Sequence, residues 1–288
     1  MQLVLGVRKG AQELEKERWG MKANFKGNSK LIFISLLIMV LCSLVLKKIF
    51  LKEDVSYYNN EVYRTIKTRT ITEIINQDLE SSVKSSNITY DKVAYITIDD
   101  GPSKFTNQIL DILDKNDVKA TFFMINRNMN TYKDEVKRIQ QEGHGAGFHS
   151  VSHDVKTLYK TPQSTLEEFS ICRNTFEEIT GETSNLIRIP YGSKPNTPEE
   201  SYKILVENGF LVWDWNLDTE DWKSTTDNIV SNVLLNGRNK DELVLLVHEK
   251  EQTVEALDGI IMILKERGYK ILPITEEKEA MNFWNKNL

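Results

Sequence analysis

The chain has 288 residues, a formal net charge of −5 and 27% charged residues. That length allows one large domain or two small ones with additional segments. The chain is acidic, and the basic residues that cluster lie in residues 1–30, next to an apolar run, so binding to nucleic acid is not expected. Two cysteines, Cys42 and Cys172, do not make a disulfide framework. We therefore expect no nucleic-acid partner and no disulfide-dependent fold.

An apolar run at residues 31–51 predicts a transmembrane helix. Residues 31–46 carry no charge, and Lys47 and Lys48 can extend to the membrane interface. Residues 1–30 are rich in basic side chains, which favours a cytoplasmic N-terminus. A buried core helix and a cleaved signal peptide are the alternatives. No small-residue cleavage pattern follows the run, so we favour an uncleaved signal anchor in a single-pass protein of the cell membrane.

Two further segments follow the apolar run. Residues 52–90 are polar, with apolar positions at loose helical spacing, and we interpret them as an extracellular stalk. Residues 91–288 then alternate short apolar runs with amphipathic stretches, and we interpret them as an extracellular catalytic domain.

Seven apolar runs in this domain predict β-strands. The candidate strands are Val93–Ile98, Ala120–Ile125, Gly145–His149, Leu186–Ile189, Phe210–Trp215, Leu243–Val247 and Lys270–Pro273. Alternation of strands with helices predicts an α/β fold with a parallel sheet. About seven units in roughly 200 residues fit a distorted, incomplete (β/α) barrel, and a doubly wound open sheet is the alternative.

Helix boundaries are marked by proline and glycine. Thr161-Pro162 and Thr197-Pro198 each predict an N-cap followed by proline at the first helical position. Three glycines stand where a helix would end in the left-handed conformation: Gly181, Gly209 and Gly268.

Polar residues collect where the predicted strands end, which is where barrel enzymes place their working side chains. The first strand runs into Asp99-Asp100, two adjacent carboxylates that are costly to place together without a cation or a proton. The third strand ends at His149, and the four-residue spacing to His153 predicts two imidazoles on one face of a helical turn. With a neighbouring carboxylate, this makes a two-histidine, one-carboxylate metal site. His144, in the preceding turn, is expected to be structural.

Three later strands end in further candidates. Arg188 can hold a carboxylate in a bidentate grip, and the turn at Pro190-Tyr191 can aim a backbone N–H at a developing oxyanion. Residues 213–222 hold three tryptophans among acids, a composition that suits sugar rings, although Trp213 and Trp215 can equally form a buried aromatic corner. His248 follows the sixth strand, and that position favours a general acid.

These five segments, in this order, resemble the NodB-homology polysaccharide deacetylases (carbohydrate esterase family four), and particularly the peptidoglycan N-acetylglucosamine deacetylases. Thr97 to Gly101 read T-I-D-D-G against the family's T-F-D-D-G. The family's H-[ST]-x-x-H, R-x-P-Y and D-x-x-D-W motifs match residues 149–153, 188–191 and 218–222. The last motif, close to L-x-L-H-D, is met in part, with Leu246 and His248 in place and Glu249 where the family has aspartate.

The resemblance implies a role for each position. It implies that Asp99 is the general base, held by Arg188, and that His248 is the general acid, tuned by Asp221. It implies a divalent metal, Zn²⁺ or alternatively Co²⁺, on Asp100, His149 and His153. It further implies an oxyanion and substrate pocket formed by Pro190, Tyr191, Trp222 and Leu246.

The implied reaction is hydrolytic removal of acetyl groups from N-acetylglucosamine units of a surface polysaccharide, releasing acetate. Peptidoglycan is the expected substrate, because a domain outside the membrane meets the cell wall first. Another surface polysaccharide or an O-acetyl ester is the alternative. From other classes, a non-haem Fe(II) oxygenase shares the ligand set, and a non-catalytic sugar-binding membrane module shares the fold.

Overall fold

The structure is a computed structural model that describes residue 73, residues 92–238 and residues 240–288. The predicted cytoplasmic segment 1–30, the predicted transmembrane segment 31–51 and nearly all of the predicted stalk 52–90 lie outside the described residues. Among the residues described, no helix combines the length and the apolar character needed to cross a membrane.

Eight parallel strands form one sheet. They are β1 (Val93–Asp99), β2 (Thr121–Met124), β3 (Gly145–Phe148), β4 (Leu186–Ile187), β5 (Leu211–Val212), β6 (Leu217–Asp218), β7 (Glu242–His248) and β8 (Lys270–Ile271). The seven predicted strands are all present; β1 and β7 are longer than predicted, and the other five are shorter. The two-residue strand β6 was not predicted, because Leu217 and Asp218 lie within an acidic, tryptophan-rich segment that lacks an apolar run.

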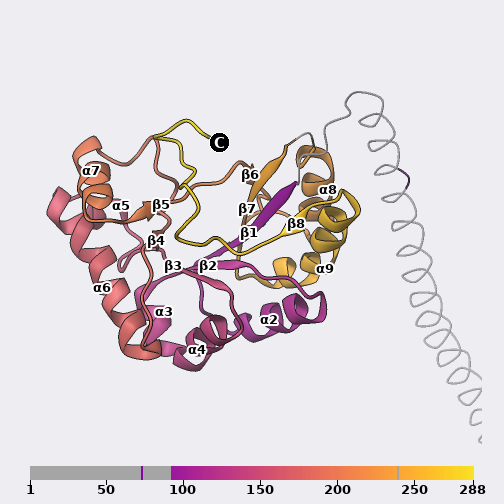
Figure 1. The fold of residues 1–288 in the computed structure, drawn as a ribbon, viewed down its shortest axis with the longest axis horizontal. Helices are drawn as coiled ribbons and strands as arrows, with labels where there is room; N and C mark the ends of the chain where they lie inside the picture. Colours follow the sequence, from indigo (N-terminus) through magenta and orange to yellow (C-terminus); the bar gives the residue numbers. More distant parts are fainter. Residues whose placement is uncertain (1–72, 74–91, 239) are drawn as a thin grey trace, which may run out of the picture. The chain divides into compact units, whose positions relative to one another are not determined.

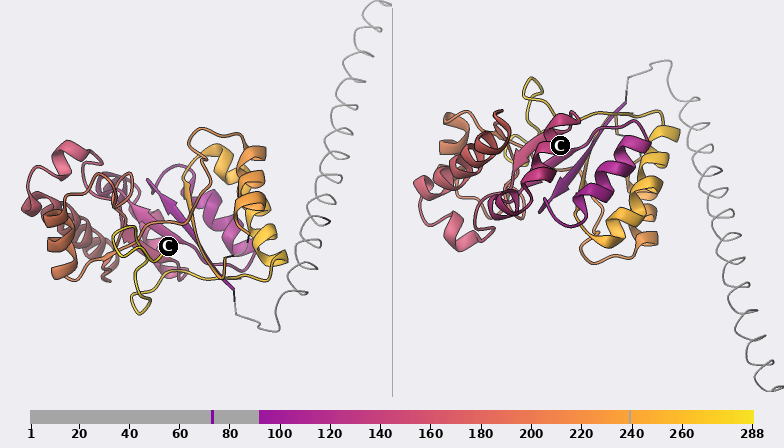
Figure 2. Two further views of the ribbon diagram at one scale, coloured as in Figure 1. Left: turned by 90° about the horizontal axis from the view of Figure 1, so that it is seen from above. Right: turned by 90° about the horizontal axis from the view of Figure 1, so that it is seen from below.

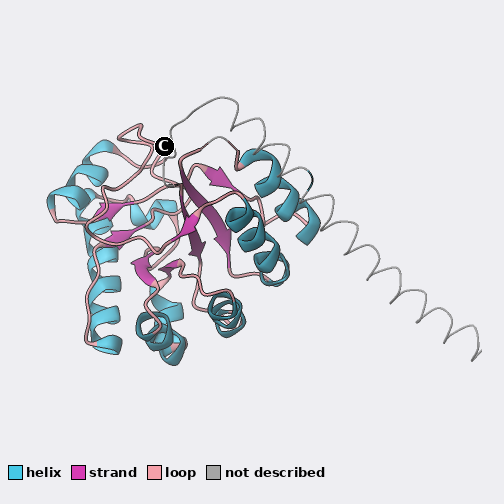
Figure 3. Cartoon of the chain, turned by 45° about the vertical axis from the view of Figure 1, so that its right-hand side comes forward, coloured by secondary structure: helices cyan, strands magenta, loops and turns pink. Residues whose placement is uncertain are grey.

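Helices alternate with these strands, as the sequence pattern predicts. They are α2 (Thr106–Lys115), α3 (Asn126–Thr131), α4 (Lys133–Gln141), α5 (Val155–Leu158), α6 (Pro162–Thr180), α7 (Glu199–Glu207), α8 (Thr226–Asn236) and α9 (Glu251–Glu266). Figure 3 shows the helices around the outside of the strands, and Figure 2 shows the same arrangement from two further sides.

The sheet is curled into an incomplete barrel. Its strand order is β5-β4-β3-β2-β1-β7-β6, and β8 pairs with the amino end of β1, beyond the stretch that pairs with β2. The end strands β5 and β6 are joined by residues 213–216 alone, which can span at most about 18 Å. A flat sheet of seven strands would be about 29 Å wide. The ends are therefore brought together by curvature, which confirms the barrel and excludes the doubly wound alternative.

Strand alternation divides the apolar side chains into two layers. Ala94, Ile96 and Ile98 of β1 face outward and pack with the helices in the larger core. Tyr95 faces inward and joins a smaller cluster with Phe123, Leu186, Trp213, Val244, Ile274 and Met281. By the same alternation, Asp99 and His248 face inward at the carboxyl ends of β1 and β7, where the two residues are paired in register.

The segment after β8 crosses toward the β5 end of the sheet (Figure 1). The Asn282 amide donates to the Val212 carbonyl at 3.0 Å, and Asp214 N–H donates to the Met281 carbonyl at 2.9 Å. This C-terminal segment, residues 280–288, therefore packs beside the junction between β5 and β6.

The two predicted N-caps, Thr161 and Thr197, have different outcomes. Thr161 caps α6 as predicted, and Pro162 occupies its first turn. The prediction for Thr197-Pro198 was wrong by one residue, because Pro198 is itself the N-cap of α7 and takes an extended conformation. The three predicted left-handed glycines are confirmed, with φ between 77° and 82°.

The capping box of α6 gives a test of local stability. The Thr161 hydroxyl accepts the Ser164 N–H at 3.0 Å, and the Ser164 hydroxyl accepts the Thr161 N–H at 2.9 Å. Thr161→Ala should lower the free energy of unfolding by about 1 kcal/mol, because an N–H at the helix start loses its acceptor. Urea denaturation measures this change. Thr161→Ser is the matched control and should retain most of the stability.

Candidate functional site

The carboxylate pair at the end of β1 is divided between two environments. Asp99 is buried inside the curled sheet, whereas Asp100 is half-buried. Asp100 has a left-handed backbone with φ 70°, and both carboxylates approach His149 Nε2, with Asp99 Oδ2 at 3.7 Å and Asp100 Oδ1 at 3.8 Å. The two acids can therefore serve different roles.

Asp100, His149 and His153 form the group that can hold a metal ion. One ligand atom from each lies within 4.8 Å of the others. The His153 and His149 Nε2 atoms are 3.4 and 3.8 Å from Asp100 Oδ1. Ligand atoms on a tetrahedral zinc ion stand about 3.4 Å apart, given bonds of about 2.0–2.1 Å. Asp100 Oδ1 is buried without a hydrogen-bond partner, which suits an oxygen reserved for a cation.

The hydrogen bond made by His149 Nδ1 fixes the protonation state of the other ring nitrogen, Nε2. Nδ1 lies 2.7 Å from the Arg188 carbonyl oxygen, which can only accept, so the proton is on Nδ1 and Nε2 presents a lone pair. Burial lowers the pKa of His149, which further favours the neutral imidazole that binds metal. This arrangement is typical of a histidine ligand.

The expected helical turn between the two histidines was wrong, although the imidazoles do converge, with ring centroids 5.0 Å apart. Residues 149–154 form a loop between β3 and α5. Ser150 and His153 take positive φ values of 72° and 49°, and the Ser150 hydroxyl accepts the His153 N–H at 3.0 Å. The loop, not a helix, therefore brings the rings together.

Arg188 is fully buried and holds Asp99 by one hydrogen bond, not by the expected bidentate grip. Its Nη1 donates to Asp99 Oδ1 at 3.0 Å and to the Thr97 hydroxyl at 2.5 Å. The rest of the guanidinium donates to the carbonyl oxygens of Trp213 and Asp214. One Asp99 oxygen thus stays free of Arg188, and Oδ2 lies 3.7 Å from His149 Nε2.

His248 and Asp221 form a second pair, in which Asp221 is fully buried and His248 is half-buried. His248 Nδ1 lies 2.7 Å from Asp221 Oδ1, while Asp221 Oδ2 accepts the His248 N–H and the Thr253 hydroxyl. Burial alone would lower the pKa of His248. The hydrogen bond to Asp221, followed by the charges of Asp99 and Asp221, outweighs burial and raises the pKa above its usual value. The protonated imidazole is therefore favoured.

The predicted oxyanion and substrate residues differ in their exposure to solvent. Tyr191 has φ 64°, and its exposed ring meets the His153 ring edge to face at 5.2 Å. Trp222 is exposed, as expected of a residue that lines a pocket, whereas Pro190 and Leu246 are buried. Leu246 pairs with Thr97 in the sheet, one layer below His248.

Three buried acids that the sequence analysis did not select hold the site loops. Glu168 of α6 accepts the N–H groups of Val151 and Ser152, between the two histidines. Asp214 accepts the Ser193 N–H and the Phe283 N–H. Glu249 accepts the hydroxyls of Ser103 and Thr106, beside the turn that carries Asp100.

The signal for these acids is weak in the sequence. Glu168 lies on an amphipathic helix, where a glutamate is usually exposed. Glu249 could be found only as a departure from the family motif. His144, by contrast, is structural as predicted: its Nδ1 accepts the Ala120 N–H at 3.1 Å, and burial lowers its pKa to about 4.

Comparison with known proteins agrees with this geometry. Residues 86–210 match the polysaccharide deacetylase family. The putative polysaccharide deacetylase YheN of Bacillus subtilis is 43% identical over 62% of this chain and 66% of its own length. A peptidoglycan-N-acetylglucosamine deacetylase of Bacillus cereus is 39% identical over 68% of this chain and 74% of its own.

A solved structure extends the agreement to the fold. The polysaccharide deacetylase Bc1974 from Bacillus cereus superposes with a TM-score of 0.65 and 40% identity, over 68% of this chain and 98% of that one. The chain therefore belongs to the polysaccharide deacetylase family, and it is a hydrolase that acts on amide bonds.

Proposed function

We propose that the chain is a metal-dependent deacetylase of N-acetylglucosamine units in peptidoglycan, releasing acetate. The observation that carries the proposal is the convergence of two groups at one end of the sheet. Asp100, His149 and His153 offer three metal ligands, and the inward-facing Asp99 and His248 stand beside them in paired register. A peptidoglycan-N-acetylglucosamine deacetylase of Bacillus cereus is among the relatives, which supports the substrate.

The chemistry divides between metal and protein. A divalent ion, Zn²⁺ or Co²⁺, would polarise the acetyl carbonyl and lower the pKa of a water molecule. Asp99, oriented by Arg188, accepts the proton of the attacking water. The Tyr191 backbone N–H faces the developing oxyanion, and Trp222, Leu246 and Pro190 form the wall around the acetyl group.

His248 completes the reaction as general acid. Its imidazolium gives a proton to the leaving nitrogen, so the products are acetate and a free amino sugar. Asp221 keeps the ring oriented through the 2.7 Å contact with Nδ1 and leaves Nε2 to donate.

We further propose that residues 31–51 anchor the protein in the cell membrane with residues 91–288 outside, because basic residues precede the apolar run. Protease digestion of intact, wall-stripped cells should cleave the C-terminal domain and spare residues 1–30.

The metal site predicts that His153→Ala removes both bound metal and activity. One of three ligands is lost, and the remaining two hold zinc weakly. Elemental analysis of the purified protein measures the metal, and acetate release from acetylated chitooligosaccharides measures turnover. Circular dichroism confirms that the variant is folded. Full turnover by a metal-stripped variant would contradict the proposal, and persistent binding of chitooligosaccharide without turnover in the wild type would favour a non-catalytic module.

The His248–Asp221 pair predicts a pH dependence. Because the pKa of His248 is raised, its protonated form survives to higher pH, and kcat/KM should fall only as pH rises through that raised value. Asp221→Asn removes the charge and should move this alkaline limb to lower pH, with a loss of about tenfold or more above neutrality. Asp134→Asn, at an exposed position on α4, should leave the limb in place. An unmoved limb in Asp221→Asn would exclude His248 as the acid.

The substrate is tested in the wall itself. A strain lacking the gene should contain less free glucosamine in its peptidoglycan and should be more sensitive to lysozyme. Chemical analysis of purified wall digests gives the first quantity. Unchanged glucosamine would point to another surface polysaccharide or to an O-acetyl ester, and release of ester-bound acetate from the two strains separates these outcomes.

A further inference from the structure

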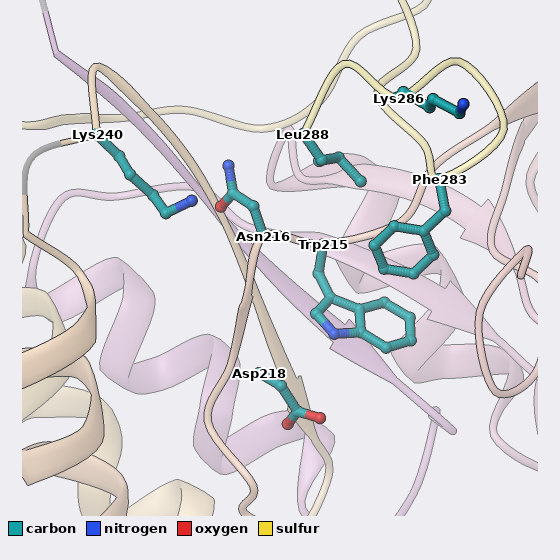
Figure 4. Close-up of a pocket in the computed structure, with 7 residues that line it drawn as sticks. All are labelled: Trp215, Asn216, Asp218, Lys240, Phe283, Lys286 and Leu288. Atoms are coloured by element: carbon teal, nitrogen blue, oxygen red, sulfur yellow. The ribbon is translucent and has the colours of Figure 1, made fainter.

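A hollow lies between the β5–β6 junction and the C-terminal segment. Its volume is about 550 Å³, within the range of small-molecule pockets. Figure 4 shows the side chains that line it: Trp215, Asn216, Asp218, Lys240, Phe283, Lys286 and Leu288. None of these is a metal ligand or an acid–base residue of the proposed reaction.

One wall of this pocket is aromatic. The Trp215 and Phe283 rings meet edge to face, with centroids 5.5 Å apart and an interplanar angle of 75°. Both side chains are half-buried, so part of each ring is open to a ligand. The Arg188 guanidinium lies 5.7 Å from the Trp215 ring, so this ring stands between the pocket and the arginine that holds Asp99. Aromatic faces of this kind suit the apolar face of a pyranose.

The opposite wall is cationic. Figure 4 shows the Lys240 ammonium directed into the pocket, toward Asn216. Within residues 92–238 and 240–288, no ion pair engages this ammonium, whereas Lys278 nearby is paired with Glu242 at 2.7 Å. Lys286, on the same C-terminal segment as Phe283, adds a second positive charge to the lining.

The polar groups of the pocket are otherwise engaged. The Asn216 side chain bonds to the backbone of Glu242 and Val244, and Asp218 Oδ1 accepts the Glu220 N–H at 2.8 Å. The ionisable side chains of the pocket are Lys240, Lys286 and Asp218, and their formal charges leave one positive charge for a ligand carboxylate to neutralise.

Sheet register relates the pocket to the reaction centre. Asp218 is level with Leu246, and Leu246 is level with Thr97, two residues before Asp99. Two strand spacings and two residue rises separate Asp218 from Asp99, a distance of about 12 Å between Cα atoms. Lys240 lies further from the reaction centre, because it precedes the amino end of β7 and reaches toward Asn216, whose side chain bonds to Glu242 and Val244, about 13–20 Å along β7 from His248. An oligosaccharide of several units spans these distances, so one glycan strand can occupy both places.

We propose that this pocket is a subsite for a carboxylate-bearing unit of the glycan strand, whose sugar ring packs on Trp215 while its carboxylate pairs with Lys240. The inference rests on the proposed function, since it concerns a distant unit of the same substrate. The carboxylate has two possible sources in peptidoglycan: the lactyl ether of a muramic unit freed of peptide, or an acidic residue of the attached peptide. Both present the same group to Lys240.

The test compares neutral and acidic probes of equal length. The neutral probe is N-acetylchitotetraose, and the acidic probes are a peptidoglycan tetrasaccharide with intact peptides and the same tetrasaccharide after amidase treatment. Lys240→Met should lower the ratio of kcat/KM for acidic over neutral probe about fivefold, as expected for one partly exposed ion pair. Lys240→Glu should lower the ratio further. Lys137→Met, at an exposed position on α4, should leave it unchanged.

The two acidic probes identify the source. A loss confined to the amidase-treated probe assigns the lactyl carboxylate, and a loss confined to the peptide-bearing probe assigns the peptide. An unchanged ratio in both Lys240 variants, with an active wild type, would overturn the subsite and leave the proposed function standing. If the wild type releases no acetate from any probe, the proposed function fails, and calorimetric binding of the acidic probes to wild type and Lys240→Glu still decides whether the pocket recognises them.

Discussion

The buried pairing of Arg188 with Asp99 is the interaction on which the rest of the site depends. The guanidinium stands inside the curled sheet, 4.3 Å from the Phe123 ring, and is fully buried. Its hydrogen bonds reach β1 and the segment after β5, while its own carbonyl accepts the His149 proton. Removing one member of a buried ion pair costs about 3–5 kcal/mol, because the other charge is left without compensation. One residue, through its side chain and its backbone carbonyl, thus orients the proposed base, a metal ligand and the β5–β6 junction.

Around this pair the backbone is unusually strained at the strand ends. Asp100, Ser150, His153, Tyr191 and Glu220 all take positive φ values without being glycine. Each such residue costs on the order of 1–3 kcal/mol and persists only where its surroundings determine it. The buried acids Glu168, Asp214 and Glu249 supply those surroundings, because each accepts donors from a loop that carries a site residue or precedes it. Buried acids on α6 and just beyond the ends of β5 and β7 therefore stabilise the geometry that the loops require.

Much of this arrangement could be predicted from the sequence, because parallel strands bring their carboxyl ends to one edge. The acids at the end of β1, the histidines after β3 and His248 at the end of β7 all follow from that rule. This rule predicts which strands and loops carry the site residues, but it does not predict the backbone φ angles within those loops. The loop at His149 was therefore expected to be helical, and the single hydrogen bond of Arg188 to Asp99 was expected to be double. Glu168 was missed because its partners lie on a separate element, across the loop that precedes α6.

The contact between Glu249 and Gly101 has a consequence for how the family can vary. A Cβ atom on Gly101 would stand 2.1 Å from Glu249 Oε1, inside the closest approach of any two unbonded atoms. Glu249 cannot withdraw freely, because its other oxygen accepts from Ser103 and Thr106. The size of the residue at position 249 therefore limits the size of the residue at position 101. Among related chains, a side chain at the position of Gly101 should therefore occur only where the position of Glu249 holds a shorter residue, such as the family's aspartate.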